Sequence, residues 1–174
     1  MLKRSSILKL EILNTIFILL LGTLLHFTFK WSDSNLFVGT FSSVNESTWE
    51  HLKLLFFPML ITAIIGHFYI KIHPNYLCIK TRAIIISLLF TIVFFYTYTG
   101  VIGTNFSFLN IGSFFVAVIL SQFYTYKKTK TNASCDNFSA SIILLVLFLC
   151  FIIFTFAPPH IALFKDPLTG MFGI

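Results

Sequence analysis

The chain has 174 residues, of which 57% are hydrophobic and only 10% are charged. Soluble domains carry about 25% charged residues, so this composition excludes an ordinary soluble globular protein. The net charge of +6 does not indicate a nucleic-acid partner, because an excess of Lys and Arg in a membrane protein usually reports orientation. The expected surroundings of the chain are a lipid bilayer.

Five apolar segments are long enough to cross a bilayer core of about 30 Å, which takes about 20 residues of helix. They comprise residues 12–29, 52–70, 83–101, 106–124 and 139–157. No small-residue cleavage site follows the first segment, so we interpret it as a helix rather than a signal peptide. We therefore predict one all-α integral membrane domain over residues 1–174, a bundle of five transmembrane helices with a tail at 158–174.

The basic residues are unevenly distributed between the segments. Of the twelve Lys and Arg residues, three lie before the first segment, three in residues 71–82 and three in residues 127–137. The positive-inside rule therefore predicts a cytoplasmic N-terminus and an external C-terminus. We expect a multi-pass protein of the plasma membrane.

The densest polar stretch, residues 45–53, lies at the start of the second segment. Glu46 and Glu50 are four residues apart and are expected to share a helix face, and Glu50 and Lys53 are spaced to pair. His51 is rotated by about 100° from Glu50 on a helix. A second part of the chain must therefore complete any site that uses both.

The tail offers that second part. His160 and Asp166 join Glu46, Glu50 and His51 as candidate site residues. Histidines and carboxylates at a water-accessible membrane edge can bind a divalent metal or perform acid–base chemistry. We predict Glu50, His51 and His160 as the metal ligands. The tail is rich in apolar side chains, so we expect it to fold back over the polar stretch.

A purely structural interpretation of the same stretch stays open. Ser47 and Glu50 match a capping box, and Asn45 is an alternative N-cap. Trp49 suits the interfacial belt of a membrane protein. Capping and anchoring leave His51 and the second glutamate unexplained.

Two histidines lie within apolar segments. His26 shares a helix face with Gly22, four residues earlier, and His67 lies near the end of the second segment. Such residues are usually hydrogen-bond partners inside a bundle, although an ionisable residue in a membrane is also a functional hint.

Three cysteines, at positions 78, 135 and 150, show no paired spacing. We expect free thiols rather than a disulfide or a zinc knuckle. His73 and Cys78 share one loop and resemble a nucleophile pair, but no acidic residue lies near to orient the imidazole.

The fourth segment carries a stripe of small residues, Ser113, Ala117 and Ser121. Small residues four apart allow a neighbouring helix to approach closely. The neighbour can belong to the same chain, to a second copy or to a partner membrane protein.

Two stretches of the chain resemble the signature stretches of a known family. They are residues 44–53 (Val-Asn-Glu-Ser-Thr-Trp-Glu-His-Leu-Lys) and the ending from Pro158-Pro159-His160 through Leu163-Phe164-Lys165-Asp166-Pro167-Leu168-Thr169-Gly170 to Gly173-Ile174. The family consists of small multi-pass membrane proteins of low-GC Gram-positive bacteria, known only as a domain of unknown function. The resemblance implies a bacterial plasma-membrane protein, and it supplies no activity, cofactor or catalytic residue.

The leading functional hypothesis is a membrane protein that binds a small ligand, ion or partner through this polar cluster. One alternative is a membrane-embedded, metal-assisted hydrolase that uses Glu50, His51 and His160. Another is an accessory subunit that packs on a larger complex through the small-residue stripe.

Overall fold

The computed structural model describes residues 4–70, 72–131 and 135–174. The regular elements among these residues are all helical. In chain order they are α1 (Arg4–Trp31), α2 (Leu36–Gly39), α3 (Thr48–Ile64), a π-helical turn (Ile65–Tyr69), α4 (Tyr76–Ile102), α5 (Ser107–Thr129), α6 (Asn137–Phe156) and a 3-10 turn (Ala162–Phe164). Five of these helices, α1, α3 with its π-helical turn, α4, α5 and α6, are long and apolar enough to cross a membrane. The prediction of an all-α chain with five such helices is confirmed.

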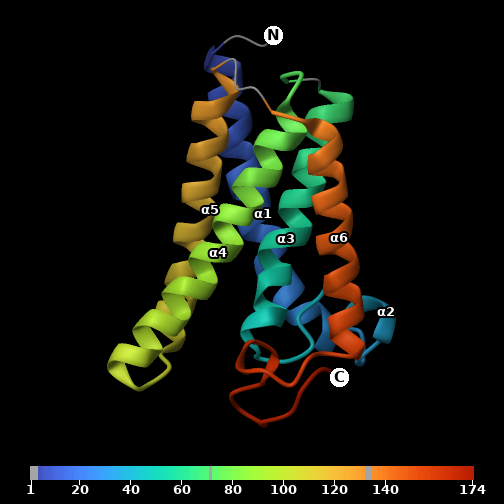
Figure 1. The fold of residues 1–174 in the computed structure, drawn as a ribbon, viewed down its shortest axis with the longest axis vertical. Coiled ribbons are helices and arrows are strands. Elements are labelled where there is room, and N and C mark those ends of the chain that lie inside the picture. Colours follow the sequence, from blue (N-terminus) through green and yellow to red (C-terminus); the bar gives the residue numbers. More distant parts are fainter. Residues whose placement is uncertain (1–3, 71, 132–134) are drawn as a thin grey trace.

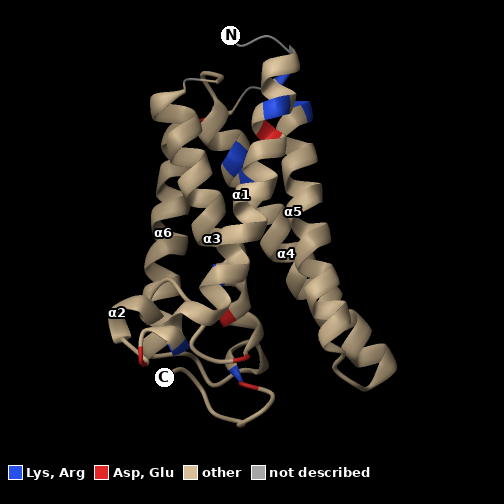
Figure 2. Cartoon of the chain, turned by 180° about the vertical axis from the view of Figure 1, so that it is seen from behind, with Lys and Arg blue, Asp and Glu red and all other residues tan. Residues whose placement is uncertain are grey.

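The five long helices run side by side, and the two chain termini lie at opposite ends of the bundle (Figure 1). We call these the N-terminal end and the C-terminal end. At the C-terminal end, the hairpin between α4 and α5 leans away from α3 and α6 (Figure 1). Charged residues gather toward the two ends of the bundle, and the broad middle shows neither blue nor red (Figure 2). This arrangement matches a bilayer, whose apolar core disfavours charge.

The core is built where α3 meets its neighbours. Phe56, Met59, Ile84, Ala117 and Phe151 are fully or almost fully buried there. Large apolar side chains also cover the outward surfaces of the long helices, and many of them are more than 40% exposed. So large an apolar exterior is unfavourable in water and favourable in lipid.

The small-residue stripe of α5 packs inside this chain. Ser113, Ala117 and Ser121 are all buried, and the Ser121 hydroxyl lies 4.0 Å from the Met59 sulfur of α3. The stripe therefore cannot be the surface through which an accessory subunit packs on a larger complex.

The N-terminal end holds a buried ionic cluster. The ammonium group of Lys80 on α4 lies 3.0 Å from the Glu11 carboxylate of α1 and 2.6 Å from the Gln122 side-chain oxygen of α5. The Tyr76 hydroxyl donates to the same carboxylate at 2.8 Å. All four side chains are at most 3% exposed. The cluster therefore joins three helices through its polar groups, although the side-chain nitrogen of Gln122 is buried without a hydrogen-bond partner.

A disulfide between Cys78 and Cys135 also lies near the N-terminal end, with 6.0 Å between the Cα atoms. The expectation of three free thiols is thus wrong for these two residues and holds for Cys150. Their separation of 57 residues gave no local signal, and the bundle brings the start of α4 to the segment before α6. The bond also consumes the Cys78 thiol that a nucleophile pair with His73 would need.

Candidate functional site

The start of α3 positions the polar stretch. Ser47 is the N-cap, and its hydroxyl accepts the Glu50 amide at 3.3 Å. The Asn45 side chain accepts the Ser47 amide at 2.9 Å. The Glu50 carboxylate accepts the amide of Val44 at 3.1 Å, rather than that of the N-cap itself. The predicted Ser47 cap is confirmed, and the second half of the capping box is displaced along the chain.

Glu46 precedes the helix and does not share a face with Glu50. Glu50 instead turns inward and forms a buried ion pair with Lys53 at 2.6 Å, as their spacing predicted. The Lys53 ammonium group also donates to the Gly39 carbonyl at 2.9 Å and to the Thr155 hydroxyl at 2.5 Å. The Glu50 carboxylate is thus already engaged by Lys53 and the Val44 amide, and the pair ties α3 to α2 and α6.

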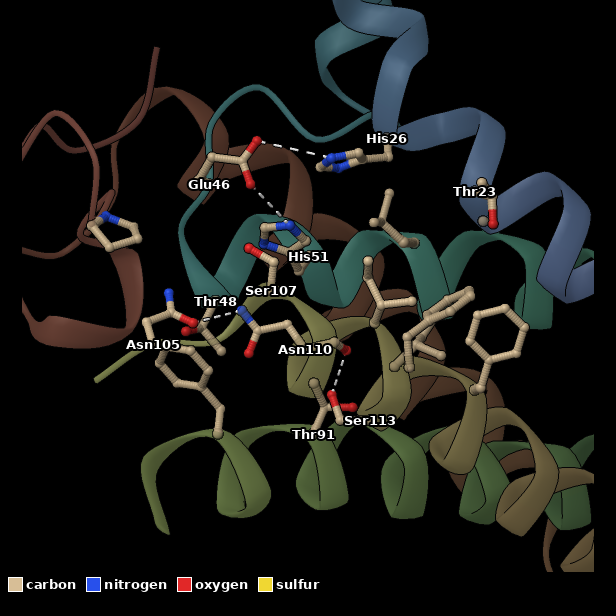
Figure 3. Close-up of a pocket in the computed structure, with 18 of the residues that line it drawn as sticks. Thr23, His26, Glu46, Thr48, His51, Thr91, Asn105, Ser107, Asn110 and Ser113 are labelled. Carbon is tan, nitrogen blue, oxygen red and sulfur yellow. Dashed lines mark hydrogen bonds and ion pairs between the residues drawn. The ribbon is translucent and has the colours of Figure 1, made fainter. Parts of the chain in front are cut away.

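His51 points away from Glu50, toward Glu46 and a histidine of α1. Nε2 of His51 lies 3.4 Å from one Glu46 oxygen, and Nε2 of His26 lies 3.9 Å from the other. The two imidazole rings are 5.3 Å apart between centroids. In Figure 3, dashed lines join the carboxylate of Glu46 to each of the two rings. All three side chains are partly exposed.

The tautomer of His51 follows from its other nitrogen. Nδ1 lies 2.9 Å from the carbonyl oxygen of Ser47, which can only accept, so Nδ1 carries a proton. A neutral His51 therefore directs the lone pair of Nε2 toward the negative oxygen of Glu46. That approach is favourable only with a positive species between the two atoms, either a proton on Nε2 or a metal ion.

The geometry fits a metal ion. One ligand atom each from His26, Glu46 and His51 can be chosen so that all three lie within 4.8 Å of one another. Ligands bound at 2.0–2.2 Å to a tetrahedral zinc ion lie about 3.3–3.6 Å apart, so small side-chain rotations suffice. The Nδ1–H to carbonyl bond of His51 is the support that metal-bound imidazoles usually have. Two histidines and one glutamate leave a fourth coordination position open.

The electrostatics keep Glu46 ionised. The hydrogen bond from His51 is the largest cause, and it lowers the pKa of the Glu46 carboxyl from its ordinary value of 4.5 despite partial burial. The charge of His26 acts in the same direction. A metal ion would therefore meet a carboxylate rather than a carboxylic acid at neutral pH.

A cavity of about 580 Å³ adjoins this cluster. It lies between α1, α3, α4 and α5, in the region where the hairpin of α4 and α5 leans outward. One part of its wall is polar, with Thr48, Thr91, Asn105, Ser107, Asn110 and Ser113 beside the three cluster residues (Figure 3). Another part is apolar, with Phe27, Leu54, Leu55, Ile111, Phe114 and Phe115.

The amides on the α5 side of the cavity are held in place by one another. The Tyr98 hydroxyl donates to the side-chain oxygen of Asn105 at 2.9 Å and also bonds to that of Asn110. The amide nitrogen of Asn110 donates to Asn105 at 2.8 Å. Asn105 and Asn110 are therefore held by one another and by Tyr98 without a ligand.

The tail closes the C-terminal end of the bundle. Phe164 packs on Trp49 at 4.8 Å between ring centroids, and the Asn45 side chain donates to the Gly173 carbonyl at 2.9 Å. Pro167 and Leu168 line the cavity. The tail thus folds back over the polar stretch.

The two candidate residues of the tail lie apart from the histidine cluster. Asp166 is buried and accepts the Leu168 amide at 2.8 Å and the Thr169 hydroxyl at 2.9 Å, which holds the tail's own turn. The exposed His160 packs edge-on against Phe172. Of the five candidates, the structure brings together Glu46 and His51, and α1 supplies His26 as the third member. The only sequence signal for His26 is its position as an ionisable residue within an apolar segment.

The helices and the site define a class, a small all-helical protein with five helices apolar enough to cross a membrane and a partly polar cavity at one end of its bundle. More particularly, the chain matches the model of a family of unknown function (DUF6512) over residues 2–174, and it belongs to that family. No curated protein matches the chain, and no solved structure matches it.

Proposed function

We propose that this protein binds a divalent transition metal ion through His26, Glu46 and His51, and that this ion is zinc. The observation that carries the proposal is the convergence of one ligand atom each from His26, Glu46 and His51 within 4.8 Å of one another at the edge of a cavity. Imidazole nitrogen and carboxylate oxygen are ligands that zinc prefers, and the set has the composition of known three-ligand zinc sites. The ligand set predicted from the sequence was Glu50, His51 and His160. The positions of these side chains support keeping His51 and replacing Glu50 and His160 with Glu46 and His26.

We further propose that the chain forms one integral membrane domain in the plasma membrane of a low-GC Gram-positive bacterium, with the N-terminal end in the cytoplasm. Nine of the twelve basic residues, three in each of three segments, support this orientation. Lys3 and Lys71, two of these nine, lie outside the residues that the structure describes. The metal site then faces the cell exterior.

The disulfide at the N-terminal end favours the opposite orientation, because disulfides are rare in the reducing cytoplasm. We give more weight to nine charges than to one bond, and we keep the cytoplasmic N-terminal end in the proposal. A membrane-impermeant reagent for amines or thiols, applied to intact cells, tests the orientation. Labelling at the N-terminal end without lysis would reverse it.

Elemental analysis of the purified protein tests the metal site. We expect zinc equimolar with the wild-type chain and its loss in His51→Ala and His26→Ala. His160→Ala is the matched control, because it removes an imidazole from the same end of the molecule without touching the cluster. Loss of zinc in His160→Ala would restore the ligand set that includes the tail. Absence of bound metal from zinc-supplemented, correctly folded wild type would overturn the proposal.

The proposed metal ion would have an open fourth coordination position beside a cavity. This arrangement favours metal-assisted hydrolysis as a second candidate function. In such sites a zinc-bound water is activated as the nucleophile. This function predicts that the zinc-loaded protein turns over an ester or amide substrate and that His51→Ala abolishes turnover while the protein still accumulates. Simple binding predicts saturable uptake without turnover.

A further inference from the structure

The cavity and the metal cluster form one continuous space. His26, Glu46 and His51 line the cavity, so a metal ion held by them would present its open coordination position to the cavity. A volume of about 580 Å³ lies within the range of about 300–1,000 Å³ that holds small-molecule ligands. The site therefore has room for a ligand much larger than water.

The apolar wall reaches the outer surface of the helices. Phe27 of α1 and Ile111 and Phe115 of α5 line the cavity and are 42%, 60% and 43% exposed. These residues lie on helices that are apolar enough to cross a membrane. In a bilayer, such a wall connects the cavity with the region of the acyl chains, and an aliphatic tail can enter along it without contacting water.

The polar end of the cavity selects the charge of the ligand. Two neutral imidazoles, one carboxylate and a divalent ion carry a net charge of +1, and the ion has a vacant position. An anionic oxygen neutralises that charge and fills the position. The ordered amides of Asn105 and Asn110 and the hydroxyls of Thr48 and Ser107 offer hydrogen bonds to its other oxygens.

We infer that the cavity binds a single-chain amphiphile with an anionic headgroup, such as an alkyl phosphate or fatty acid. The headgroup oxygen ligates the metal ion, and the chain lies along Ile111 and Phe115 toward the lipid. This inference rests on the proposed metal site and adds the chemical class of its ligand.

Cobalt substitution provides a direct readout, because the visible spectrum of Co²⁺ changes with its ligands. The protein in phosphatidylcholine nanodiscs is loaded with Co²⁺ and titrated with dodecyl phosphate, inorganic phosphate and dodecanol in separate arms. We expect dodecyl phosphate to shift the spectrum saturably. Inorganic phosphate should require a concentration at least about 100-fold higher, since it lacks the chain that is buried along the apolar wall. Dodecanol should leave the spectrum unchanged.

Two matched variants test the path of the chain. Ile111→Trp narrows the cavity, and we expect it to weaken dodecyl phosphate binding at least about tenfold while the cobalt spectrum without ligand stays as in wild type. Ile119→Trp makes the same change two turns along α5, at a residue that is 55% exposed and does not line the cavity. It should bind like wild type.

The outcomes separate the two proposals. A protein that binds no Co²⁺ overturns the metal site and the inference with it. A cobalt spectrum that dodecyl phosphate leaves unchanged overturns the inference alone. Equal concentrations of inorganic and dodecyl phosphate at half-saturation, or equal binding by the two tryptophan variants, overturn the role of the acyl chain and thereby the inference.

Discussion

The two ends of the bundle both hold ionisable side chains among apolar helices, but these side chains differ in their contact distances and in their exposure. At the N-terminal end, the Lys80 ammonium group lies 3.0 Å from Glu11 and 2.6 Å from Gln122, and all three side chains are almost wholly buried. At the C-terminal end, His26, Glu46 and His51 meet at 3.4–3.9 Å, stay partly exposed and line a cavity.

The difference separates a structural role from a binding role. Charged groups that use their hydrogen-bonding capacity on one another leave nothing for a ligand, and removing one of them leaves an uncompensated charge. Groups that meet at longer distances beside open space retain capacity for an added ion. The Glu50–Lys53 pair belongs to the first kind, although it is adjacent in sequence to His51 of the second kind.

The largest expected effect is at the N-terminal end. Lys80→Ala leaves the Glu11 carboxylate buried without its partner, and we expect a loss of about 3–5 kcal/mol in the free energy of unfolding. Denaturant unfolding in detergent measures it. Lys127→Ala, an exposed lysine at the same end, is the control and should change little. If the two variants had similar free energies of unfolding, the buried cluster at the N-terminal end would not have the structural role that distinguishes it from the C-terminal end.

The disulfide should also stabilise the N-terminal end. Reduction of the Cys78–Cys135 bond removes a constraint on the unfolded chain and so raises the conformational entropy of the unfolded state. It should therefore lower the free energy of unfolding by about 2–4 kcal/mol. Thermal unfolding with and without reductant measures the change. In a Cys78→Ser variant the reductant should have no further effect, and Cys150→Ser should behave as wild type, since Cys150 is free.

Acid should weaken the metal site through its histidines. Each imidazole must be deprotonated to bind the ion, so below the ordinary imidazole pKa the affinity should fall about tenfold per pH unit for each histidine, or about 100-fold for both. The pKa of Glu46 is lowered from 4.5, so its carboxylate stays charged above that value and contributes no pH dependence there. Zinc titrations from pH 8 to pH 5 check this, and a flat profile would contradict histidine ligation.

The smallest expected effect concerns the helix cap that positions the site. Ser47→Ala removes the hydroxyl that accepts the Glu50 amide, and we expect a loss of about 1 kcal/mol. Thermal unfolding measures it, with Ser141→Ala as an exposed serine that caps no helix. If Ser47→Ala lost zinc without losing stability, Ser47 would act on His51 rather than on the helix.

Local patterns predicted much of the outline of the molecule. Apolar segments of sufficient length predicted five long helices, and the Ser47 cap and the Glu50–Lys53 pair followed from spacing within one helix. These features depend on residues at most four positions apart. The free thiols were wrongly predicted because the partners Cys78 and Cys135 are 57 residues apart.

Hydropathy and helix period act locally, so the sequence alone was enough to predict the five long helices. It also marked residues 45–53 as an unusual polar stretch. The packing of the helices was needed to show that Glu50 turns into the core, that His51 faces Glu46, and that His26 of α1 completes the cluster. The reason is that helix packing sets which faces of distant segments meet, and a one-residue step of about 100° sends Glu50 into the core and His51 toward the cavity.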